Sequence, residues 1–194
     1  MKFNSLFCAT AIAATLLTTG CAHNINISPV AEAPKATAER VNKTVGMFIS
    51  AEDRALEVVS PGGGGDKLSY LPYKDLEGPL FFTLSNVYSK VETLPGTDAA
   101  TVTGKNVSLV FSPKLTTTSS SSSAFTWPPT DFSVTIKMKA IDNAGKVLWE
   151  EAVTGNGKAE FAEFKADFPL AARRASKDAL EQLEKLVRAK EGVK

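Results

Sequence analysis

Cysteine is nearly absent from this chain of 194 residues, which contains only Cys8 and Cys21. The rest of the sequence therefore has no thiol with which to form a disulfide. A domain without disulfides must be held together by its own hydrophobic core. The chain is long enough for one domain with such a core, and a hydrophobic content of 43% is ordinary for a globular protein.

The chain has one histidine and almost no net charge, and each of these facts argues against one broad class of function. The single histidine, His23, lies near the N-terminus. Its position excludes Ser-His-Asp and Cys-His nucleophile systems, and histidine metal sites, from the folded domain. A formal net charge of +1 provides no electrostatic basis for binding nucleic acid. We therefore expect no nucleic-acid partner, no metal and no cofactor.

Acidic residues are scattered and do not form an evident acid/base pair. Glu150 and Glu151 are adjacent, so on a strand their side chains would point to opposite faces. Glu160, Glu163 and Asp167 could line one face of a helix, where exposure to solvent is the favoured interpretation. We expect a protein that is not an enzyme. A hydrolase that uses two distant carboxylates stays a less favoured alternative.

Long apolar runs are absent except near the N-terminus, where Lys2 precedes the apolar stretch Leu6–Leu17. A membrane-spanning helix needs roughly 20 apolar residues, and this run is shorter. A basic start, a short apolar segment and small residues before a cysteine are typical of a bacterial secretory signal. The end of the segment, from Leu17 through Gly20 to Cys21, resembles the lipobox of bacterial lipoproteins. It departs from that pattern in having Thr18 where leucine is preferred.

The resemblance to lipoproteins implies a specific processing route. Residues 1–20 would be the signal peptide, cleaved between Gly20 and Cys21, and the Cys21 thiol would carry a diacylglycerol with a further acyl chain on the new amino group. Ala22 follows the cysteine in place of the aspartate that retains lipoproteins in the inner membrane. The sorting rule then implies the outer membrane of a Gram-negative cell, with the domain facing the periplasm. A transmembrane anchor and ordinary cleavage with unmodified Cys21 are the alternatives.

Residues 21–42 contain prolines, alanines and small polar residues without a sustained apolar period, which indicates a lipidated N-terminus and flexible tether. Such a tether would span about 25 Å as a relaxed coil and about 65 Å if fully extended. We expect it to hold the domain away from the membrane. The folded domain is expected over residues 43–192.

Apolar periodicity predicts the elements of this domain. Strands are expected at residues 43–50, 55–60, 107–116, 132–140 and 146–154. Helices are expected at residues 73–91 and 170–190, and phenylalanines at helical spacing precede the second helix. The order of elements predicts a single α+β domain: a largely antiparallel sheet of about five strands with two helices packed on one face.

The loop at residues 116–130 contains a serine run followed by Phe125 and Trp127 beside two prolines. Exposed aromatic residues on a loop can anchor a partner, although folding back to cap the sheet is the favoured interpretation. The architecture resembles small periplasmic lipoproteins that serve as accessory subunits of envelope assembly and transport systems. That resemblance implies a non-enzymatic interaction module with an envelope protein as partner, bound through a sheet edge or the Phe125–Trp127 loop. A lipid- or glycan-binding carrier is the alternative.

Overall fold

The computed structural model describes residues 22–30, 39–60, 67–121 and 130–193. The strands are β1 (Ala22–Asn24), β2 (Val41–Met47), β3 (Val58–Val59), β4 (Lys67–Tyr70), β5 (Tyr88–Thr93), β6 (Leu109–Ser120), β7 (Asp131–Asp142) and β8 (Val147–Lys158). The helices are α2 (Ala51–Ala55), α3 (Pro72–Val87), α4 (Ala99–Gly104), α5 (Phe161–Ala166) and α6 (Leu170–Glu191).

The main sheet has five strands in the order β5-β2-β6-β7-β8. The long strands β6, β7 and β8 are antiparallel over nearly their whole length, whereas β2 pairs in parallel with β5 and β6. A small second sheet has the order β1-β4-β3. The prediction of an α+β fold with a largely antiparallel sheet of about five strands is confirmed.

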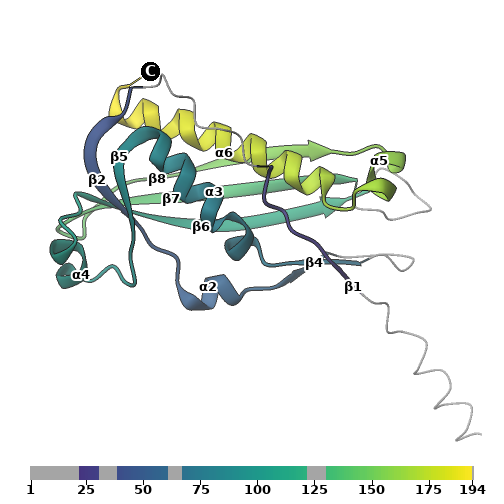
Figure 1. Cartoon of the computed structure of the whole chain (residues 1–194), viewed down its shortest axis with the longest axis horizontal. Helices are drawn as coiled ribbons and strands as arrows, with labels where there is room; N and C mark the ends of the chain where they lie inside the picture. Colours follow the sequence, from purple (N-terminus) through teal and green to yellow (C-terminus); the bar gives the residue numbers. More distant parts are fainter. Residues whose placement is uncertain (1–21, 31–38, 61–66, 122–129, 194) are drawn as a thin grey trace, which may run out of the picture.

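Side-chain alternation along β7 separates a dry face from a wet one. Phe132, Val134, Ile136, Met138 and Ala140 are at most 4% exposed and join the main core. Helices α3 and α6 pack on this face, as Figure 1 shows. On the other face, α4 covers a small second cluster formed by Leu94, Val102, Val107 and Val110.

The predicted helix at residues 73–91 is wrong in its last part. Helix α3 ends at Val87, and Tyr88–Thr93 is the edge strand β5, paired in parallel with β2. Tyr88 would be buried either in the last turn of a helix or at the start of a strand, so its burial does not distinguish the two. The backbone pairing with β2 decides in favour of a strand. The predicted strand at residues 55–60 is also too long. Its first residue, Ala55, is the last residue of helix α2, and only Val58–Val59 forms strand β3.

The expected tether at residues 21–42 is not supported where the chain is described. Strand β1 pairs in parallel with β4, so that Ala22 lies opposite Lys67. Ile25 is 8% exposed and Ile27 is fully buried in the main core. Two alternating apolar residues are too few to produce a clear sequence pattern, and the hydrogen-bond partner β4 is distant in the sequence. The folded domain therefore includes residues that directly follow Cys21.

Helix α6 lies directly on the backbone of β8 at two glycines. An ideal Cβ at Gly155 would be 2.1 Å from the Ala179 nitrogen, and one at Gly157 would be 2.0 Å from the Ala171 carbonyl oxygen. Ala175 lies between these contacts and is fully buried. Glycine in the strand and alanine in the helix together permit this close approach.

We predict that Gly157→Ala lowers the free energy of unfolding by about 1–3 kcal/mol, because the added methyl group would overlap helix backbone that cannot move aside alone. Urea denaturation followed by circular dichroism measures this change. The control is Gly78→Ala in α3, where an added Cβ meets no atom within 4 Å. That variant should gain about 0.5–1 kcal/mol from helix propensity. Equal midpoints for both variants would contradict the proposed contact.

Candidate interaction surface at the α5 end

Figure 1 places α5 and β1 toward one end of the molecule, and α4 and the C-terminus toward the other. We call these the α5 end, comprising Ala22, His23, Lys158 and residues 161–168, and the α4 end, comprising residues 99–105 and the turn 142–147. The three long strands of the main sheet run between the two ends.

Side chains of α6 close one half of the β8 edge. Asp178 accepts a hydrogen bond from the Asn156 backbone N–H at 2.9 Å, and Gln182 donates to the Thr154 carbonyl at 3.0 Å. Strand β8 is an edge strand, and its outward backbone groups would otherwise be available to a partner strand. Strand addition is therefore blocked over this half of β8.

The other half of β8, at the α4 end, carries two half-exposed apolar side chains. Val147 is 48% exposed and Leu148 is 49% exposed, next to an irregularity in the pairing of β7 with β8. Glu150 pairs with Lys137 at 3.2 Å, and Glu151 pairs with Lys190 of α6. The two glutamates thus face opposite sides of the sheet, as predicted. The residues 147–152 are the part of this edge that a partner could reach.

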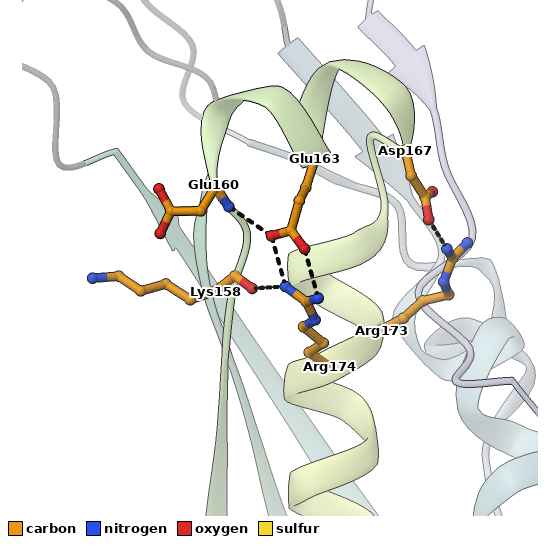
Figure 2. Close-up of polar contacts among 6 residues, drawn as sticks. All are labelled: Lys158, Glu160, Glu163, Asp167, Arg173 and Arg174. Carbon is orange, nitrogen blue, oxygen red and sulfur yellow. Dashed lines mark hydrogen bonds and ion pairs between the residues drawn. The ribbon is translucent and has the colours of Figure 1, made fainter.

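Ion pairs hold α5 against α6 and the end of β8 (Figure 2). Arg174 of α6 donates to both carboxylate oxygens of Glu163, at 3.0 and 2.9 Å, and to the Lys158 carbonyl at 2.6 Å. Glu163 also accepts from the Glu160 backbone N–H at 2.9 Å, and Arg173 pairs with Asp167. These ion pairs fix the position of α5, while Glu163 and Arg174 stay partly exposed, in keeping with the solvent-exposed face expected for the acidic residues.

The same contacts perturb the titration of Glu163. Hydrogen bonds from the Arg174 guanidinium, followed by the Glu160 backbone N–H, lower the pKa of Glu163 to about 2. The carboxylate in turn raises the pKa of Arg174. Both groups are fully charged at neutral pH, and each neutralises the other.

Strand β1 is fixed to the α5 end by backbone and ring contacts. The His23 ring stacks on Phe168 with 5.0 Å between centroids, and Phe168 packs edge-on against buried Phe164 at 5.1 Å. The Ile25 backbone N–H donates to the Ser69 carbonyl at 2.9 Å, continuing the pairing with β4. The residue that follows Cys21 is therefore already part of the folded domain.

A shallow groove of about 480 Å³ lies on the wet face of the sheet at the α5 end. Ser133 and Asp131 line it and alternate with buried Phe132. Thr118 and Ser133 share a hydrogen bond at 2.6 Å, and Lys158 pairs with Asp131 at 3.4 Å. The lining mixes polar side chains with Phe132 and Gly157. It lies on the sheet surface, and not between sheet and helices, where a lipid carrier would need an apolar pocket. A glycan-binding role stays a prediction.

Gly20, Cys21, Phe125 and Trp127 lie outside the described residues, so lipidation, cleavage and the loop contact stay predictions. The close packing of α6 on the backbone of β8 was not predicted from the sequence. A usable signal was present, because glycines two residues apart inside a strand mark a close backbone approach.

Among the described residues, no three His, Cys, Asp or Glu side chains gather as metal ligands. No helix in that part of the chain is long and apolar enough to cross a bilayer.

Comparison with known proteins yields structural likenesses only. No family model matches the sequence, and no curated protein matches it. Protein XCC0632 from Xanthomonas campestris, described as DUF330, superposes with a TM-score of 0.49 at 8% identity, covering 88% of this chain and 99% of that one. Two structures of the PelC dodecamer from Paraburkholderia phytofirmans give TM-scores of 0.41 and 0.42 at 16% and 15% identity. They cover 74% and 73% of this chain, and 94% and 91% of the PelC chains. With TM-scores below 0.5, these likenesses carry no argument about function.

We predict that Arg174→Gln returns the pKa of Glu163 from about 2 toward its ordinary value of 4.5. Carboxyl ¹³C NMR titration of the folded protein measures it. Because folding lowers this pKa, the interaction stabilises the fold above about pH 4.5, and its contribution is lost as the pH falls toward 2. Arg173→Gln is the matched control and should leave Glu163 unchanged, since Arg173 pairs with Asp167. Titration of Glu163 near 4.5 in the unaltered protein would refute the pairing.

Proposed function

We propose that this protein is a lipid-anchored module of the outer membrane that faces the periplasm and binds another envelope protein without catalysing a reaction. One observation carries the proposal: a signal pattern that ends in Gly20–Cys21 is followed at once by a strand of the folded domain. An acyl group on Cys21 would thus attach to a defined point of the domain. An accessory subunit of a membrane assembly requires delivery to one membrane and attachment at a fixed point.

Packing between the sheet and the helices supports a binding module over a lipid carrier. Leu80 of α3, Phe111 of β6 and Leu183 of α6 are each fully buried in the main core. These side chains occupy the layer in which a carrier would need an acyl-chain cavity. Close packing of this kind favours function at the surface.

Partner binding is assigned to the 147–152 segment of β8, which combines exposed apolar side chains with an accessible strand edge. Val147 and Leu148 are the exposed apolar residues of this segment. A partner that adds a strand there would bury both side chains and satisfy the outward backbone groups. The Phe125–Trp127 loop is the alternative place of contact that the sequence raises, beside the favoured interpretation that it folds back to cap the sheet.

Anchoring is tested by labelling with radioactive palmitate in a Gram-negative host. The unaltered chain should incorporate the label and fractionate with the outer membrane, because more than one acyl chain makes anchoring stable. Cys21→Ser should lose the label and the membrane association. Mass spectrometry of the mature N-terminus identifies the modified residue. Continued labelling of Cys21→Ser would disprove the assignment.

Partner binding is tested by placing a photoreactive amino acid at position 148 in intact cells. We expect a crosslinked species of defined mass from this position. The matched control is position 74, an exposed site on α3, which packs against β5 at the opposite edge of the sheet, and it should give only monomer. Monomer alone at both positions, under several crosslinking chemistries, would count against an interaction module.

A further inference from the structure

We infer that the α5 end rests against the bilayer, so that the long strands stand away from the membrane and the 147–152 segment is presented on the far side. This inference deepens the proposed function and depends on the acylation of Cys21. The occupant of the α5 end is the lipid headgroup layer of the membrane that holds the anchor.

The attachment point leaves little freedom for any other orientation. Only one peptide unit, about 3.8 Å between Cα atoms, separates Cys21 from Ala22. Ala22 is paired with Lys67, and His23 is stacked on Phe168. Acyl chains on Cys21 must therefore enter the bilayer beside β1, and the α5 end must lie next to the lipid surface.

The chemistry of the α5 end suits a membrane interface. Phe161 is 54% exposed, and the Lys165 ammonium lies 5.6 Å from the centre of its ring. An exposed aromatic ring beside a lysine can enter the boundary layer while the ammonium stays among the headgroups. Lys67, opposite Ala22, adds a second exposed cation.

Acidic residues at the α5 end do not oppose contact with anionic headgroups. Glu163 pairs with Arg174, Asp167 pairs with Arg173, and Asp131 pairs with Lys158. Pairing neutralises the carboxylates that would otherwise repel lipid phosphates. The carboxylate of Glu160, the exposed N-cap of α5, remains, and the exposed lysines Lys67 and Lys165 outnumber it. The surface offered to the bilayer thus has an exposed aromatic ring and an excess of lysine over unneutralised acid.

This orientation places the partner segment at a distance from the membrane. Strands of 12 residues at about 3.4 Å per residue reach roughly 40 Å, and β6, β7 and β8 have this length. The sheet thus takes over the spacing role expected of the tether. Val147 and Leu148 are presented at the α4 end, where a periplasmic protein could reach them.

The orientation is tested with fluorophores on the acylated protein in phosphatidylethanolamine–phosphatidylglycerol vesicles. Cys21 is acylated and Cys8 is removed with the signal, so an introduced cysteine is a unique labelling site. Lys165→Cys reports on the α5 end, and Lys105→Cys, an equally simple lysine replacement, reports on the α4 end. With a spin-labelled headgroup lipid in the vesicles, fluorescence at position 165 should be strongly quenched and fluorescence at position 105 should persist.

A second pair of variants tests the contribution of the exposed ring. Phe161→Ser should reduce the quenching at position 165, whereas Leu148→Ser, which removes an apolar side chain of similar exposure at the other end, should leave it unchanged. Acylation is verified by mass before each measurement. Acylated protein with equal quenching at both positions, or none at either, overturns the orientation and leaves the anchoring intact. Absence of acylation overturns both.

Discussion

The close backbone contact between α6 and β8 positions much of this domain. Without side chains at Gly155 and Gly157, the helix lies on the strand closely enough for its own side chains to reach the strand edge. Asp178 and Arg174 bond backbone groups of β8 only because of this approach. Arg174 then holds Glu163, and with it α5. One close contact thus positions an edge strand, a helix and the end of the domain.

The two ends of α6 connect this contact to distant parts of the chain. At its start, the α5–α6 turn brings Phe168 against His23 and so fixes β1. Near its end, Arg188 donates to the carbonyls of Glu39 and Asn86, joining the helix to the start of β2 and the end of α3. These contacts fix α6 relative to β1, β2 and α3. A lipid attached beside β1 would therefore orient the whole domain.

Elements with strong internal periodicity were predictable, and those defined by a distant partner were not. The alternation along β7 and the apolar stripe of α6 predicted a sheet with helices on one face. By contrast, β5 continues the apolar pattern of α3, and only its pairing with β2 makes it a strand. Strand β1 is three residues long and depends on β4 for its hydrogen bonds. Local pattern contains no information about such partners.

The scarcity of cysteine, the α+β class and the prediction of a signal that ends before Cys21 could be obtained without the structure. Each of these follows from residue identity or from local spacing. The tertiary structure was needed to show that the residues after Cys21 belong to the fold and that Arg173 and Arg174 pair with acidic side chains. It also decided which part of the β8 edge is closed. These outcomes depend on which segments meet in space, because backbone hydrogen bonds and ion pairs form between residues far apart in the chain.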